Sequence, residues 1–180
     1  MNRMTLNQKV FVSDQLERTM AFNNVSTTAL GTGLSYTQSW ASKLKNGKIP
    51  LQFDSIEGLK ELLPKQSELL FIELANKITG IIPPVANGDG LDQSAIAFAS
   101  RTRREINEAT KAFEQACDEL ESKPEFVRDT SDVTNLVNQL FDVLLMTQSG
   151  IAIFCNQFGL NAQSLEQKRE QYWKAEHLTK

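Results

Sequence analysis

Residues 26–48 carry the pattern that most constrains the fold of this chain, because it fits two short helices joined by a tight turn. Ser26 and Thr37 each stand before a stretch of helical spacing and can cap it through a side-chain oxygen. Ser35 interrupts the first stretch, and Asn46-Gly47 provides a left-handed stop after the second. The segment therefore predicts one helix on each side of a turn at Ser35.

The two predicted helices differ in what they present to the inside and to the outside. Apolar residues recur at the inward positions, which are Leu30, Leu34, Tyr36, Ala41 and Leu44. The outer side of the second helix is polar and carries no carboxylate; its residues are Gln38, Ser39, Trp40, Ser42, Lys43 and Lys45. A helix that enters the major groove of DNA needs amides and hydroxyls for base edges, cations for phosphates and no negative charge. The second helix is therefore predicted to read double-stranded DNA.

This segment resembles the lambda-repressor-like helix-turn-helix family (the xenobiotic-response-element type) of phage and bacterial regulators. The resemblance covers roughly residues 8–65 and rests on Ser26, Leu30, Leu34, Thr37-Gln38, Ser42, Leu44 and Asn46-Gly47-Lys48. Two residues depart from the family pattern. Gly31 stands where the family prefers Ala, and Ser35 stands where it usually has Gly, which strains Ser35 if the turn needs a positive φ.

The resemblance also implies roles for single side chains. Those that would meet bases are Gln38, Ser39, Ser42 and Lys43, and those that would meet phosphates are Thr27, Asn46 and Lys48. Gln38 is the residue that we expect to recognise a base, because a bidentate amide contact to adenine contributes about 1–3 kcal/mol of discrimination. The full predicted DNA-binding set is Ser26, Thr27, Thr37, Gln38, Ser39, Trp40, Ser42, Lys43, Lys45, Asn46 and Lys48.

Two of these residues need separate comment. Trp40 could contact a thymine methyl or the sugar-phosphate wall, and it could equally pack on the end of the first helix as an extra core residue. Lys45, like Lys43, is expected to bind a phosphate if the motif is a DNA reader, and to be a plain surface lysine otherwise.

The charge of the chain is divided unevenly along its length. The net charge is −3, but residues 1–65 hold eight Lys/Arg and five Asp/Glu, a net of +3. The remaining residues hold eleven and seventeen, a net of −6. This division fits a DNA-binding head on an acidic tail that limits non-specific DNA binding. The same division fits an ordinary acidic protein. It supports DNA binding only because the positively charged part of the chain contains residues 26–48.

An enzymatic function is not predicted. His177 is the single histidine and lies close to the end of the sequence, where a solvated side chain is expected. Glu105, Glu108 and Glu119 lack the histidines of a carboxylate metal site. The sequence holds no phosphate-binding glycine loop and no nucleophile motif. We expect no catalytic residue, no cofactor and no metal.

A membrane location is not predicted either. The most apolar stretch, Val143–Phe158, is interrupted by Gln148, Ser149 and Gly150, which makes it short and polar for a span. Charged and amide residues punctuate the first twenty residues, unlike a signal peptide. Cys117 and Cys155 are interpreted as reduced core thiols, with a redox pair as the alternative. These features predict a cytoplasmic, nucleoid-associated protein.

The rest of the chain predicts helices. A five-helix head is expected over residues 1–80, with helices at 10–22, 54–63 and 67–79 besides the two above. A linker at 81–90 contains Pro83-Pro84 and Gly88-Asp89-Gly90. A tail of long helices follows over 91–180, with helices at 91–122, 133–157 and 162–177. The expected fold is all-α, a lambda-repressor-like head followed by a long-helix bundle.

The tail helices carry more apolar surface than they can bury alone. The first has an apolar stripe of Ile96, Phe98, Ile106, Ala109, Phe113, Cys117 and Leu120. The second is apolar on more than one face and must be surrounded, with Gly150 either a close contact to another helix or a kink. Leu165, Tyr172 and Trp173 are expected to anchor the third.

This apolar surface predicts a homodimer through residues 91–180, since a single head of this kind reads only a few base pairs. The alternatives are a tail folded back on its own head, and a docking site for a regulatory protein. Two functions follow: a sequence-specific transcriptional regulator of repressor type, of phage or prophage origin, or a helical protein–protein interaction module. The head would be a DNA reader in the first and a protein-binding surface in the second.

Overall fold

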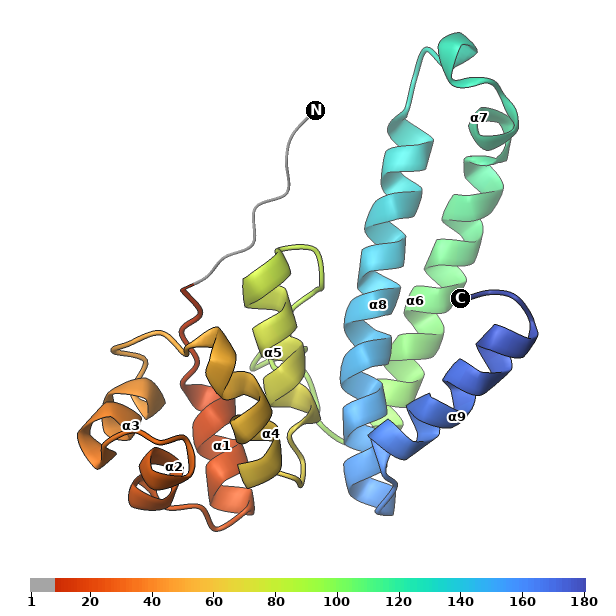
Figure 1. Ribbon diagram of the computed structural model, residues 1–180. Coiled ribbons are helices and arrows are strands. Elements are labelled where there is room, and N and C mark those ends of the chain that lie inside the picture. Colours follow the sequence, from red (N-terminus) through yellow and green to blue (C-terminus); the bar gives the residue numbers. More distant parts are fainter. Residues whose placement is uncertain (1–8) are drawn as a thin grey trace. The chain divides into compact units, whose positions relative to one another are not determined.

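The computed structural model describes residues 9–180, and the elements along this range are helices (Figure 1). Val10 and Leu51 form a single antiparallel bridge, and the described residues form no longer strand. The all-α prediction is confirmed. The chain divides into two compact units, Met1–Val85 and Ala86–Lys180, so the boundary falls inside the predicted linker.

The described part of the first unit, from residue 9 onward, contains five α-helices. They are α1 (Asp14–Phe22), α2 (Thr27–Gly33), α3 (Gln38–Lys45), α4 (Ile56–Leu62) and α5 (Glu68–Thr79), with a 3-10 turn, η1 (Phe53–Ser55), before α4. Their inward faces share one core, whose fully buried aliphatic residues include Val12, Leu16, Leu30, Leu44, Leu59, Leu63 and Leu70. Gly80, with φ +65°, ends α5 in the left-handed conformation that glycine adopts freely.

The segment before α1 differs from the prediction. The sequence predicts a helix from Val10, but α1 begins at Asp14 and Val10 is extended, with its carbonyl accepting a 2.7 Å hydrogen bond from Leu51 N. Val10 and Val12 are both buried because residues two apart share one side of an extended chain. Phe22, at the end of α1, is exposed. Only some of the apolar residues in the predicted helix 10–22 follow helical spacing, and Phe22 does not lie on the buried side of α1.

The second unit contains α6 (Ala95–Gln115), α7 (Cys117–Glu121), the 3-10 turn η2 (Pro124–Phe126), α8 (Ser131–Phe158) and α9 (Ala162–Ala175). The helices α6 and α8 run side by side as a hairpin, and α9 returns along the C-terminal half of α8 (Figure 1). Ser94 caps α6, with its hydroxyl oxygen accepting from Ala97 N at 3.3 Å. Asn161 caps α9 by accepting from Ser164 N at 2.7 Å.

Only some residues of the predicted apolar stripe on α6 lie on the face that packs against α8. The buried residues recur at helical intervals: Ala95, Phe98, Glu105, Ala109, Ala112 and Ala116. Four members of the predicted stripe are exposed, namely Ile96, Ile106, Phe113 and Leu120. The prediction combined two neighbouring stripes of one helix, and only the stripe rich in alanine packs against α8. The predicted helix 91–122 is also shorter, since it begins at Ala95 and breaks at Ala116.

The long helix α8 is unbroken through Gly150, as the close-contact alternative requires. A β-carbon at Gly150 would lie 3.8 Å from Thr102 Oγ1 of α6, an ordinary contact distance. By length and composition α8 could cross a membrane, since its most apolar window has a mean hydropathy of 1.3. Core helices of soluble proteins meet the same criteria. Only 28% of that window is buried, so the elements of one chain do not surround α8.

The last helix is less anchored than predicted. No residue of α9, which the structure describes throughout, is buried; Leu165 and Tyr172 are exposed and Trp173 is half-buried. Cys155 is buried in the second unit and Cys117 is half-buried, and the two sulfurs are not bonded to each other. The core-thiol interpretation thus applies fully to Cys155 only.

Candidate nucleic-acid interface

The helices α2 and α3 begin with the side-chain caps that the sequence predicts. Ser26 Oγ accepts a hydrogen bond from Ala29 N at 3.1 Å, and Thr37 Oγ1 accepts from Trp40 N at 3.2 Å. Each cap satisfies a backbone N–H that has no acceptor inside its own short helix. The caps therefore fix where α3 begins and which of its side chains come first.

The turn between α2 and α3 requires a left-handed backbone conformation at Ser35, which is unfavourable for serine. Ser35 has φ +61°, a left-handed conformation that costs a residue with a β-carbon about 1–2 kcal/mol. Two backbone hydrogen bonds hold the turn, from Ser35 N to Thr32 O at 3.0 Å and from Tyr36 N to Gly31 O at 2.7 Å. The strain expected at Ser35 is present.

Gly31 lies where the backbones of α2 and α3 come closest. A β-carbon on Gly31 would lie 2.9 Å from both the carbonyl carbon and the carbonyl oxygen of Thr37, and 3.1 Å from Gln38 N. These neighbours are backbone atoms that cannot rotate away. Glycine at this position therefore permits the close crossing that sets the direction of α3.

The outward residues of α3 separate into exposed and half-buried positions. Gln38, Ser39 and Lys43 are exposed, whereas Ser42 is half-buried. Ala41 and Leu44 are fully buried in the core of the first unit, which fixes the rotation of the helix. An amide, a hydroxyl and an ammonium group consequently share the solvent side of α3, and this helix contains no carboxylate.

Lys45 is placed differently from the prediction. Its Nζ lies 2.8 Å from Glu17 Oε1 of α1, and its side chain is 29% exposed. The reason is helical spacing, because Lys45 follows the buried Ala41 by four positions and so lies on the side of α3 that faces α1. Lys45 is thus half-buried and paired with a carboxylate, unlike the exposed Gln38, Ser39 and Lys43 with which the sequence grouped it.

The aromatic pair of this region also corrects one prediction. Tyr36, expected to face inward, is 37% exposed and stacks on Trp40, with ring centroids 3.9 Å apart and an interplanar angle of 13°. Trp40 is half-buried and packs against the core of the first unit. Of the two alternatives left open for Trp40, the structure places it as a packing residue.

The C-terminal end of α3 has the left-handed stop that Asn46-Gly47 predicts. Gly47 has φ +63°, and Lys48 N donates to Lys43 O at 2.8 Å. Asn46 Nδ2 donates to Ser42 O at 2.7 Å, so this side chain caps the helix. Lys48 is exposed beyond the stop, while Ser26 is exposed and Thr27 half-buried at the start of α2.

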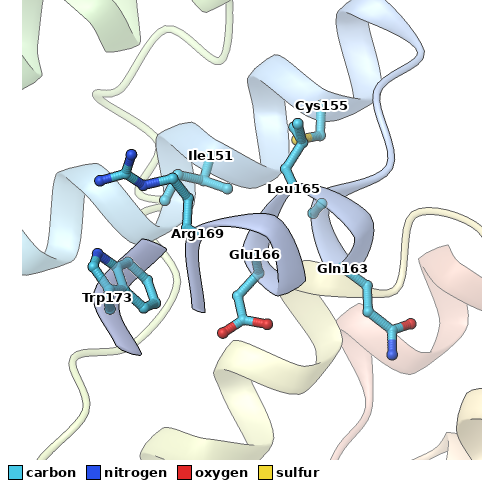
Figure 2. Close-up of a pocket in the computed structure, with 8 residues that line it drawn as sticks. Ile151, Cys155, Gln163, Leu165, Glu166, Arg169 and Trp173 are labelled. Atoms are coloured by element: carbon cyan, nitrogen blue, oxygen red, sulfur yellow. The ribbon is translucent and has the colours of Figure 1, made fainter. Parts of the chain in front are cut away.

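The second unit holds a cavity that sequence reasoning missed. It has a volume of about 580 Å³ and lies between the C-terminal end of α8 and α9, with Ile151, Cys155, Leu165 and Trp173 among its lining residues (Figure 2). The Arg169 guanidinium carbon lies 4.3 Å from the centroid of the Tyr172 ring. Arg169 is followed by Tyr172 and Trp173 three and four positions later, a spacing that predicts this ring contact but not the cavity. Within residues 9–180 no group of three or more His, Cys, Asp or Glu residues could hold a metal ion.

Comparison with protein-family models, with curated proteins and with solved structures finds no match to this chain. A functional interpretation therefore rests on the chemistry of the residues and on their placement.

Proposed function

We propose that this protein is a sequence-specific double-stranded DNA-binding transcriptional regulator, a repressor-type control protein of phage or prophage origin that acts as a dimer in the cytoplasm, on the nucleoid. In this proposal residues 1–80 form a five-helix lambda-repressor-like head, and residues 91–180 form the long-helix bundle that joins two copies. The observation that carries it is the solvent side of α3, where Gln38, Ser39 and Lys43 are exposed on a helix without carboxylates.

The proposed mechanism follows from the chemistry of these groups. The Gln38 amide can pair with the N6 and N7 positions of adenine in the major groove, and the Ser39 hydroxyl can pair with a neighbouring base edge. Lys43 and Lys48, both exposed, neutralise phosphates and release counterions, which makes the affinity depend on salt. The caps at Ser26 and Thr37 and the crossing at Gly31 hold α3 in one orientation before DNA arrives.

Selection of bound fragments from random DNA by the purified full chain tests this function. The selection is run at two salt concentrations beside Gln38→Ala and Lys43→Ala. We expect a two-fold-symmetric site whose preference at one base pair per half-site relaxes in Gln38→Ala. Lys43→Ala is expected to weaken binding to all sequences and to reduce the salt slope by about 1. Recovery of unenriched DNA at both salt concentrations contradicts the proposal.

One observation favours the second candidate function, a head that docks a regulatory protein. Because Glu17 neutralises Lys45, the region of α3 has less positive charge than its sequence indicates. A protein-docking head should keep its partner when Lys43 and Lys48 are replaced by alanine, whereas a DNA reader should lose affinity. The double variant therefore separates the two functions.

A further inference from the structure

An open apolar groove runs along the second unit between α6 and α8. It has a volume of about 700 Å³, and its lining includes Ile106, Phe113 and Leu120 from α6 and α7, and Leu136, Leu140 and Val143 from α8. Only Leu136 among these six is buried. The groove is thus a surface that the α6–α8 hairpin leaves without a covering element within its own unit.

The size of this surface is close to what a stable dimer needs. Seven large apolar residues on the groove and on the adjoining side of α8 are between 38% and 54% exposed: Ile106, Phe113, Leu120, Val137, Leu140, Phe141 and Leu144. At about 200 Å² for a whole large side chain, they expose on the order of 600 Å². A standard interface buries about 800 Å² on each partner, so these residues would supply most of such an area. The estimate lies at the upper end of the range of about 300–600 Å² for the largest apolar patch on a monomer.

The spacing of the exposed residues indicates what covers them. Ile106 and Phe113 on α6 and Leu120 on α7 follow one another at intervals of seven, and Leu136 and Val143, which line the groove on α8, are seven apart as well. A seven-residue period keeps a stripe facing a second helix along its length, which a globular or extended partner does not require. A helical hairpin with two such stripes matches one half of a four-helix bundle.

The charges beside the groove favour a specific orientation. Arg103 lies one turn before Ile106 and is exposed, whereas Glu121 is exposed next to Leu120 at the other end, and Glu114 is exposed next to Phe113 in the middle. Two copies aligned in parallel would bring like charges together. Two antiparallel copies bring Arg103 of each toward Glu121 of the other, with Phe113 at the centre of the groove.

We infer that this groove is covered by the same groove of a second copy, with the two α6 helices antiparallel across a two-fold axis near Phe113. The inference deepens the proposed function, since it rests on that function for the need to join two heads. It assigns the contact to one face of residues 106–144. Such an interface is self-complementary, because each copy contributes the same residues.

Sedimentation equilibrium of the full chain at several concentrations tests the inference. We expect twice the mass of the 20.2 kDa chain for the unchanged protein, and a dimer dissociation constant raised at least a hundredfold by Phe113→Glu. Leu140→Glu, on the other helix, should have the same effect with unchanged helicity by circular dichroism. Ile96→Glu is the matched control, because Ile96 is 78% exposed on α6 outside the groove and its replacement should leave the dimer intact.

The orientation is tested by exchanging charges. Arg103→Glu should weaken the dimer, and combining it with Glu121→Arg should restore it. A monomeric unchanged protein, or a dimer that both groove variants leave intact, overturns the inference. Failure of the charge exchange to restore the dimer overturns the antiparallel arrangement.

Two parallel measurements distinguish a dimer formed through the groove from DNA binding by the head and from lipid binding by α8. A chain that dimerises through the groove but selects no DNA leaves the inference standing and defeats the proposed function. Sedimentation with vesicles of mixed neutral and anionic phospholipid tests whether α8 meets lipid instead. Binding to vesicles with loss of the dimer would overturn the inference in favour of a lipid-facing helix.

Discussion

The carbonyl oxygen of Thr37 lies 2.9 Å from the position that a β-carbon on Gly31 would occupy. Because both the carbonyl carbon and the oxygen are that close, the contact cannot be relieved by a side-chain rotation. A residue without a side chain thus lies at the crossing that aims α3.

Gly31→Ala should destabilise the first unit by about 1–3 kcal/mol, the usual cost of overpacking, despite the better helix propensity of alanine. Urea denaturation followed by circular dichroism measures it. Gly150→Ala in α8 is the matched control, because there a β-carbon would make contacts of 3.5 Å or longer. This control should stabilise the protein by up to about 1 kcal/mol. A stabilising Gly31→Ala would show that α2 and α3 cross less closely.

Ser35→Gly should stabilise the turn between α2 and α3. The left-handed conformation at φ +61° costs serine about 1–2 kcal/mol, while glycine adopts it freely. Part of that gain is lost to the larger backbone freedom of glycine in the unfolded chain, so we expect a net gain of about 0.5–1 kcal/mol. The midpoint of urea denaturation measures the change. Ser39→Gly, inside α3, is the control and should destabilise by about 0.5–1 kcal/mol.

Local signals in the sequence were sufficient for the caps, the turn and the stop of the α2–turn–α3 segment, but not for the side chains of Tyr36 and Lys45. Caps, turn residues and the stop at Gly47 act through neighbours in the chain, so their outcome can be read from a few adjacent residues. Predictions that depended on contacts between helices were less accurate. The pairing of Lys45 with Glu17 depends on how α1 lies against α3, and no pattern within α3 shows it.

The tail shows the same limit for long helices. Sequence periodicity detected apolar positions on α6 but could not decide which of two stripes meets α8. The alanines at 109, 112 and 116 are buried because small residues let the two backbones approach, and the larger Ile106 and Phe113 stay outside. The predicted stripe therefore included Phe98 and Ala109 of the buried face together with Ile106 and Phe113 of the exposed one.

Trp40 should behave as a packing residue in solution. Trp40→Phe keeps an aromatic ring against Tyr36 and the core, so we expect DNA affinity to change less than about twofold and stability to fall by about 1 kcal/mol. Trp40→Ala should destabilise the first unit by less than about 3–5 kcal/mol, the cost for a fully buried aromatic residue, because Trp40 is half-buried. Thermal unfolding and fluorescence titration with DNA measure the two effects. A large loss of affinity in Trp40→Phe at unchanged stability would instead assign the indole to DNA.

Glu17→Gln should increase DNA affinity, although Glu17 lies on α1 and outside the predicted reading helix. The substitution removes the carboxylate that holds Lys45 Nζ at 2.8 Å and leaves a cation available to a phosphate. The salt slope of binding should then steepen by about 1. Stability should change little, because exposed ion pairs contribute about 0–1 kcal/mol. Glu57→Gln on α4 removes the same charge without releasing Lys45, so an equal gain in that control would mean that net charge alone is responsible. Titrations of both variants at four salt concentrations decide between a released phosphate contact and a general charge effect.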